Sequence, residues 1–194
     1  DPAVNAALAH IGGMISAATE QSPILMGLLL GGVIKMICTS PLSSMALTAM
    51  LGLTGLPMGI AAIACFGGSF TNGVIFKMLH FGDNSNVAAV MMEPLTQAHI
   101  ITKHPIPIYC SNFFGGGFSG VAAAFLGIIN NAPGTASPIP GLLAPFAFNP
   151  PLKVLMALLL AAISGTLAGI VGAIVFKKKY DMKPELSVIN SFEE

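Results

Sequence analysis

Charged side chains are scarce in this sequence, and Arg is absent from it altogether. Charged residues make up 8% of the 194 residues, whereas 54% are hydrophobic. A soluble domain of average composition carries about 25% charged residues, which keep its surface hydrated. A soluble fold of this chain would therefore expose large apolar patches, which cause aggregation unless they are interfaces. The composition excludes an ordinary soluble domain and favours an integral membrane protein.

The scarcity of charge also argues against several function classes. The formal net charge is zero, and the Lys cluster at Lys177 to Lys179 flanks an apolar run, so nothing indicates a nucleic-acid partner. The cysteines Cys38, Cys65 and Cys110 show no CxxC or paired spacing, so we expect buried thiols rather than disulfides or zinc ligands. We recognise no metal site, no cofactor motif and no nucleophile with its base, and the sequence leaves enzymatic activity open.

Long charge-free runs separate the few charged residues. A spanning helix needs about 20 apolar residues. Two apolar runs are long enough: residues 58–79, in which Lys77 near the end is the one charged residue, and residues 154–176, which have none. The first run is rich in Gly and Ala, which predicts a span packed against other helices. The second ends at Lys177 to Lys179, and positive residues favour the cytoplasmic side. We therefore expect a membrane-embedded domain over residues 1–176 and a cytoplasmic tail over residues 177–194.

Prolines interrupt the other apolar segments. Breaks are expected near Pro41, within a run of hydroxyl residues, and near Pro105. Residues 109–117, which contain three consecutive glycines, are expected to be flexible, and residues 130–150, with five prolines, to form a loop folded into the protein body. Lys35 would snorkel if it lay near an interface. We predict an all-α, polytopic transmembrane fold with about four to six segments, including broken or re-entrant helices, as half of a transporter-like fold.

Glu93 is the first candidate for a binding residue. An ionisable group among apolar residues at membrane depth costs several kcal/mol unless it is paired or hydrated, so it indicates a buried partner or a wet cavity. The alternative is that Glu93 ends a helix at the interface and pairs with Lys77 or Lys103. Both interpretations stay open.

Other polar residues extend the candidate site. His99 follows Glu93 by six residues and is suited to hydrogen-bond a hydroxylated ligand or relay a proton, although a structural role is equally compatible. His104 precedes a proline, which favours a structural role at the start of a helix. The hydroxyls around Pro41 either bind ligand or satisfy the interrupted backbone. The residues expected to bind substrate are Glu93, Gln97, His99, Thr39, Ser40, Ser43, Ser44 and Asn112.

Six segments of the chain, taken in order, resemble a known family. They are ISAATEQSPILMG (15–27), TSPLSSMALTAMLGLTGLPM (39–58), EPLTQAHI (93–100), HPIPIYCSNFFGGGFSG (104–120), NNAPGTASPIPGL (130–142) and FNPPLKVL (148–155). The chain resembles the EIIC-like membrane proteins of the phosphotransferase-system sugar permease class, in the branch that includes perfringolysin O regulator-like proteins. Members of this family are longer, so we expect the chain to be the C-terminal half, with an N-terminal set of membrane helices missing.

The resemblance implies a fold that holds its substrate between helices near the middle of the membrane. It also implies that Glu93-Pro94 is similar to a Glu before Pro in the substrate-binding loop of sugar permeases. We predict a multi-pass permease subunit of the bacterial cytoplasmic membrane that binds and translocates a small polyhydroxylated solute such as a sugar, within a phosphotransferase system. The alternative is a membrane-embedded sensor or regulator that binds a ligand without moving it. Expected partners are the solute, the lipid bilayer, the missing N-terminal half, phosphocarrier proteins and further copies of the chain in a homo-oligomer.

Overall fold

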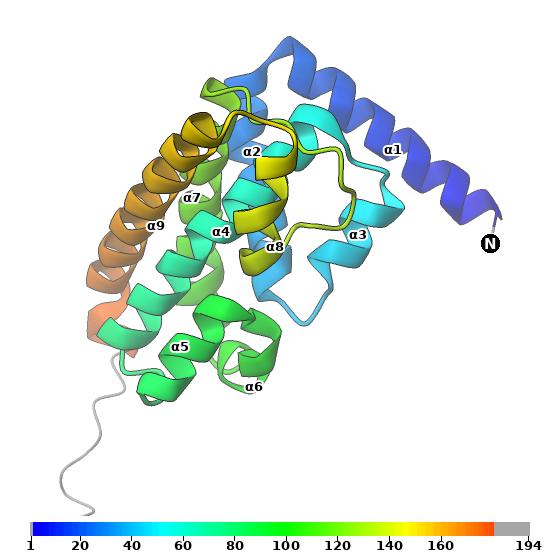
Figure 1. Cartoon of the computed structure of the whole chain (residues 1–194). Helices are drawn as coiled ribbons and strands as arrows, with labels where there is room; N and C mark the ends of the chain where they lie inside the picture. The colour runs from blue at the N-terminus through cyan, green and yellow to red at the C-terminus, as the bar shows by residue number, and fades with distance from the viewer. Residues whose placement is uncertain (1, 181–194) are drawn as a thin grey trace, which may run out of the picture.

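The computed structural model describes residues 2–180 of the protein, and the regular secondary structure in them is helical. Figure 1 shows a bundle of long helices with shorter ones packed on it, and α1 projecting from one end. No strand occurs within residues 2–180, so the predicted all-α fold is confirmed. The elements are α1 (Pro2–Gln21), α2 (Pro23–Thr39), α3 (Ser44–Met50), α4 (Gly55–Met78), α5 (Asn84–Met92), η1 (Pro94–Gln97), α6 (Ala98–Ile101), α7 (Pro105–Phe125), α8 (Pro138–Leu143), η2 (Ala144–Ala147) and α9 (Pro151–Tyr180).

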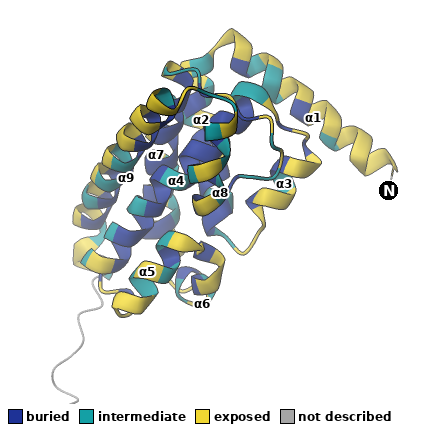
Figure 2. Cartoon of the chain, viewed as in Figure 1, coloured by how far each residue is buried: buried dark blue, intermediate teal, exposed yellow. Residues whose placement is uncertain are grey.

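Helices α2, α4, α7 and α9 form the central bundle, in which α7 contacts the other three. α4 lies in the interior, and every residue from Pro57 to Cys65 is buried (Figure 2). Small side chains such as Ala61, Ala62 and Ala64 let the neighbouring backbones approach closely. The prediction that this segment is a packed helix rather than a lipid-facing one is confirmed.

Helix α9 covers one side of the bundle and leaves large apolar side chains uncovered. Leu159, Leu167 and Val171 are 62%, 57% and 60% exposed. Within residues 2–180, α4 and α9 are the two helices that are long and apolar enough to cross a membrane; their 24 and 30 residues correspond to about 36 and 45 Å. The expected number of four to six segments, and the multi-pass topology with it, stays a prediction.

The C-terminal end of α9 lies beyond the predicted span. The helix continues through Lys177, Lys178 and Lys179 to Tyr180. The rest of the predicted cytoplasmic tail, residues 181–194, lies outside the described residues. The proposed boundary between a membrane domain and a tail therefore stays a prediction.

Helix α7 corrects the expectation of a flexible element. Residues 109–117 form part of a continuous helix that runs from Pro105 to Phe125. Consecutive glycines weaken an isolated helix, but here they allow close contact with α2. A Cβ atom on Gly31 of α2 would lie 2.6 Å from the carbonyl oxygen of Gly116. The flexible interpretation was wrong because tertiary packing holds the glycines in a helix.

Residues 130–150 contain more regular structure than expected. α8 and η2 lie in this segment, and α8 packs on α4. The preceding turn is held by hydrogen bonds from Asn130 Nδ2 to Thr135 Oγ1 (2.8 Å) and from the Gly55 amide to Asn131 Oδ1 (3.1 Å). The segment is thus folded into the protein body as predicted, but its helices were missed because prolines begin them.

The two expected helix breaks are present. α2 ends at Thr39 and α3 begins at Ser44, with Pro41 between them. Pro105 is the first residue of α7, a position where the missing N–H leaves no hydrogen bond unmade. Both interruptions are exposed or half-exposed at Pro41 to Ser43 and at Lys103 to Pro105.

Gly120→Ala tests the α2–α7 contact. A Cβ atom at Gly120 would collide with the Gly27 carbonyl oxygen and lie 3.1 Å from Gly31 Cα. We expect the substitution to lower the free energy of unfolding by about 1–3 kcal/mol, because the two backbones must move apart. The measurement is the apparent melting temperature of the purified protein in detergent.

Gly13→Ala is the matched control, because it also lies in a helix but has no atom within 4 Å of the added Cβ. Alanine there should leave the melting temperature unchanged or raise it, since Ala favours helix by up to about 1 kcal/mol over Gly. Equal melting temperatures for the two variants would contradict the close contact.

Candidate functional site

Three interruptions of the helices, distant in sequence, meet at one small pocket. They are the turn between α2 and α3, the junction of α5 with η1, and the start of α8. The pocket, called here the Glu93 pocket, is lined by Cys38, Leu42, Ser43, Ser44, Met45, Glu93, Leu95 and Ser137. Its volume is about 40 Å³, which is room for about one water molecule.

The serines of the pocket are positioned by helix starts. Ser43 precedes α3, and its hydroxyl accepts a hydrogen bond from the Ala46 amide at 3.1 Å. The next residue, Ser44, is buried and donates to the Ala136 carbonyl oxygen at 2.6 Å. Ser137, which is the N-terminal cap of α8, comes directly after Ala136 in the chain. The Ser44 hydrogen bond therefore joins α3 to the segment that places Ser137.

Glu93 links α5 to η1 in an extended conformation (φ −147°, ψ 96°), which Pro94 after it favours. Ser137 Oγ donates a hydrogen bond to Glu93 Oε2 at 3.4 Å, while much of the Glu93 side chain is exposed. Lys77, one of the partners considered from the sequence, instead donates to Asn84 Oδ1 at 2.7 Å. Glu93 thus ends a helix and also contributes a carboxylate to the pocket.

A second group of polar residues, here the amide chain, is buried between the helices. Asn72 of α4 donates through Nδ2 to Thr39 Oγ1 at 3.3 Å, and its Oδ1 accepts from Asn112 Nδ2 of α7 at 2.6 Å. Asn112 Nδ2 also donates to the Ile108 carbonyl oxygen. Asn112 Oδ1 has no hydrogen-bond partner within residues 2–180. Thr39 and Asn112 are therefore brought together, in the interior and not in the Glu93 pocket.

Lys35 is fully buried, so it does not snorkel to an interface. Its Nζ atom lies 3.5 Å from the Cys65 carbonyl oxygen. The alkyl stem packs against α4 and α7 at Gly68 and Gly116, whose missing side chains leave it room. Lys35 precedes Cys38, which lines the pocket, by one helical turn. The ammonium group is thus held in the interior of the bundle, next to α4.

Three predicted site residues belong neither to the Glu93 pocket nor to the amide chain. Gln97 is buried, but its Oε1 accepts a hydrogen bond from Asn86 Nδ2 at 2.8 Å, which ties η1 to α5. His99 is exposed on α6. Ser40 bonds to the backbone of its own turn, donating to the Ile37 carbonyl oxygen at 2.8 Å. Ser40 thus takes the backbone-satisfying role that the sequence left open.

His104 has the structural position that the sequence favoured. It precedes the first residue of α7 and stacks on Phe81, with ring centroids 4.4 Å apart and planes 9° apart. Partial burial, together with the neighbouring positive charge of Lys103, holds the pKa of His104 below its ordinary value. The imidazole is therefore biased towards its neutral form.

Sequence reasoning missed two residues of these groups, Ser137 and Asn72. Ser137 before Pro138 has the pattern of a helix start, but it lies in a segment that was interpreted as a loop. Asn72 is an amide inside a span of small and apolar residues, where a polar group indicates function or interhelical bonding. The presence of an amide within an apolar span could therefore have indicated Asn72 from the sequence.

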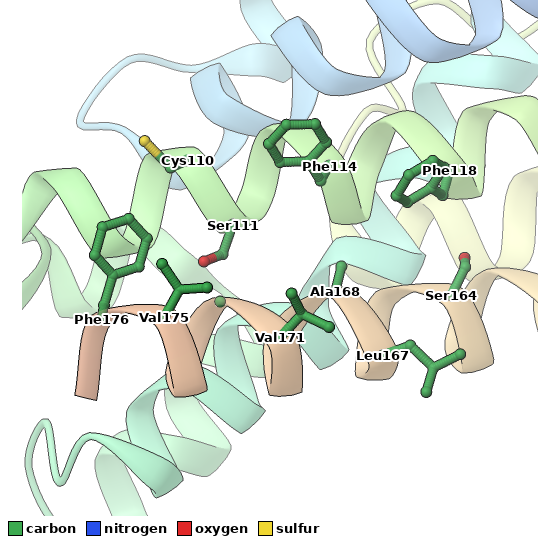
Figure 3. Close-up of a pocket in the computed structure, with 11 residues that line it drawn as sticks. Cys110, Ser111, Phe114, Phe118, Ser164, Leu167, Ala168, Val171, Val175 and Phe176 are labelled. Carbon is green, nitrogen blue, oxygen red and sulfur yellow. The ribbon is translucent and has the colours of Figure 1, made fainter. Parts of the chain in front are cut away.

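A larger cavity of about 690 Å³ lies between α7 and α9 (Figure 3). Its lining is almost entirely apolar and includes Phe114, Phe118, Val171 and Phe176. Such a wall offers a carbohydrate too few hydrogen-bonding groups to replace its water, so the cavity is unsuited to a polyhydroxylated solute. Within residues 2–180, no three His, Cys, Asp or Glu side chains are grouped to hold a metal ion.

Asn72→Leu and Asn112→Leu test the amide chain. Asn72→Leu leaves Thr39 Oγ1 without its partner and keeps the unpartnered Asn112 Oδ1, whereas Asn112→Leu removes that oxygen and leaves Asn72 Oδ1 without its partner. A stranded buried polar group costs about 1–3 kcal/mol. We therefore expect Asn72→Leu to lower the melting temperature in detergent more than its matched counterpart Asn112→Leu; the reverse order would contradict the hydrogen-bond assignment.

The comparison with protein families covers nearly the whole chain. A family described as "Phosphotransferase system, EIIC" matches residues 1–187. Neither the search of curated proteins nor the search of solved structures gave a match. The family match agrees with the helical fold and the two apolar spans. The chain belongs to the EIIC family of the phosphotransferase system.

Proposed function

We propose that this chain is part of a permease that binds a small polyhydroxylated solute, such as a sugar, at the Glu93 pocket and moves it across the bilayer. Family membership supplies the general role, a membrane component that works with other phosphotransferase components. The observation that carries the proposal is the meeting of the Glu93 carboxylate with Ser43, Ser44 and Ser137 at three helix interruptions. Discontinuous helices commonly form the substrate sites of transporters.

The chemistry of the pocket suits a neutral ligand with several hydroxyl groups. A carboxylate accepts hydrogen bonds from ligand hydroxyls, and such charge-assisted bonds are about twice as strong as neutral ones. Serine hydroxyls both donate and accept, so they match the mixed character of a sugar. The exposure of Glu93 lets a ligand reach its free lone pairs.

The pocket must widen to admit a solute. Its volume of about 40 Å³ is far below the roughly 300–1,000 Å³ of small-molecule sites. α3 is short, and five of its seven residues are exposed or half-exposed, so few of its side chains are held by packing. We expect α3 to move away from Glu93 on binding, since elements with few buried contacts open at the lowest free energy.

The burial of Lys35 supports a functional role for the interior of the bundle. A buried ammonium group at membrane depth is costly, and one carbonyl contact at 3.5 Å offsets little of that cost. Lys35 lies one turn before Cys38, which lines the pocket that carries Glu93. In this proposal Lys35 balances the Glu93 charge when water leaves the pocket.

A ligand sensor that does not transport would need the same polar pocket. Uptake of solute into proteoliposomes separates the two functions, because a sensor binds without accumulation. The other predicted partners, namely a phosphocarrier protein, an N-terminal membrane half and further copies of the chain, are parts of the same proposal. Phosphocarrier-dependent uptake in the reconstituted system would support the permease.

Glu93→Gln tests the binding site in the complete protein. We expect affinity to fall on the order of ten- to a hundredfold, because the amide loses the charge of the acceptor while it keeps the size. Binding is measured in detergent with a panel of free hexoses, pentitols and disaccharides. Glu20→Gln, an exposed carboxylate on α1, is the control and should bind as the wild type does. Unchanged affinity in Glu93→Gln would remove this residue from the site.

Lys35→Met separates function from stability. Methionine fills a similar volume without a charge to desolvate, so the melting temperature in detergent should stay the same or rise. Uptake into proteoliposomes should be lost, because the Glu93 charge is no longer balanced. A variant that is as stable as the wild type and transports normally would show that Lys35 has no role in translocation.

A further inference from the structure

The apolar cavity between α7 and α9 has the form of a groove along two antiparallel helices (Figure 3). Cys110 of α7 lies near Phe176 of α9 at one end, and Phe118 lies near Ser164 at the other. From Ser164 to Phe176 the groove follows thirteen residues of α9, a rise of about 18 Å. One leaflet of the hydrocarbon core is about 15 Å thick, so the groove is long enough to hold much of an acyl chain together with the ester region of a lipid.

Ser111 places a polar group in this apolar wall. Its side chain is 3% exposed, and within residues 2–180 its Oγ atom has no hydrogen-bond partner. Figure 3 shows the hydroxyl pointing from α7 towards α9. A Cβ atom at Gly172 would collide with Ser111 Oγ, so the glycine makes room for it. A buried hydroxyl of this kind requires a partner, and the groove is the space from which one would reach it.

Positive charge gathers at the end of the groove nearest Ser111. Lys177, Lys178 and Lys179 follow Phe176 directly and are exposed. Gly172, beside Ser111, precedes Lys177 by five residues, about 7.5 Å along the helix. Basic clusters next to a membrane span attract anionic lipid headgroups.

We propose that the groove binds one anionic phospholipid of the surrounding bilayer. Its acyl chain lies along Phe114, Phe118 and Val171, an ester carbonyl accepts a hydrogen bond from Ser111, and the phosphate lies among the lysines at the end of α9. The order of these three features along α9 is the order of the parts of the lipid. A transmembrane helix as occupant would account for the apolar wall but not for the unpartnered hydroxyl followed by three cations.

The test is native mass spectrometry of the complete protein, delipidated in detergent and supplied with phosphatidylglycerol or with phosphatidylcholine of the same acyl chains. We expect the wild type to retain phosphatidylglycerol at least about tenfold better, because three lysines favour the anionic headgroup. Val171→Trp should fill the groove and lower retention of both lipids. Ile174→Trp is the matched control, since Ile174 is 62% exposed against 60% for Val171 but does not line the groove.

Two further variants distinguish the contribution of the lipid headgroup from that of the ester group. Replacing Lys177, Lys178 and Lys179 together by Gln should abolish the preference for phosphatidylglycerol and leave retention of phosphatidylcholine unchanged. Ser111→Ala should lower retention of both lipids severalfold without a lower melting temperature, because the hydroxyl has no partner within the protein.

Three results would overturn the proposal. The first is equal retention of the two lipids by the wild type. The second is equal retention by Val171→Trp and Ile174→Trp at equal melting temperatures. The third is a lipid-free dimer that Val171→Trp dissociates, which would assign the groove to a second copy of the chain.

Discussion

The polar groups in the interior of the bundle are held together by the close approach of α2, α4 and α7. Glycines make it possible, because Gly31 and Gly116 bring the backbones of α2 and α7 into contact where any side chain would collide. The stem of Lys35 occupies the space that Gly68 and Gly116 leave. The same spacing lets Asn72 reach both Thr39 and Asn112. With wider helix separation, these polar groups would face cavities or lipid, at a high cost in free energy.

The roles proposed for the two cavities rest on the polarity of their linings more than on their volumes. The small Glu93 pocket holds a carboxylate and serine hydroxyls at helix interruptions, where backbone and side-chain groups are not used by a regular helix. The larger groove holds aromatic and aliphatic side chains with one unpartnered hydroxyl. A sugar needs hydrogen bonds in place of its water, whereas a lipid tail needs none. The two cavities are therefore suited to ligands of opposite chemistry within one bundle.

Features set by local sequence were predicted well. The packed helix α4 and the uncovered helix α9 follow from runs of small and large apolar residues, and the breaks near Pro41 and Pro105 follow from the geometry of proline. The helical state of residues 109–117 was not predictable in this way, because it depends on contacts with α2. Of the candidate site, Glu93, Ser43 and Ser44 meet in one pocket, while Gln97 and His99 lie elsewhere.

An α-helical membrane protein was predictable from this sequence, because composition, apolar run length and proline position can be evaluated without knowledge of tertiary contacts, and the family follows from the match over residues 1–187. Tertiary structure alone decided which polar residues meet. Ser137 joins Glu93 across 44 residues of chain, and Asn72 joins Thr39 across 33. Such pairings depend on how closely the helices pack and on their rotation, and no local pattern in the sequence specifies either.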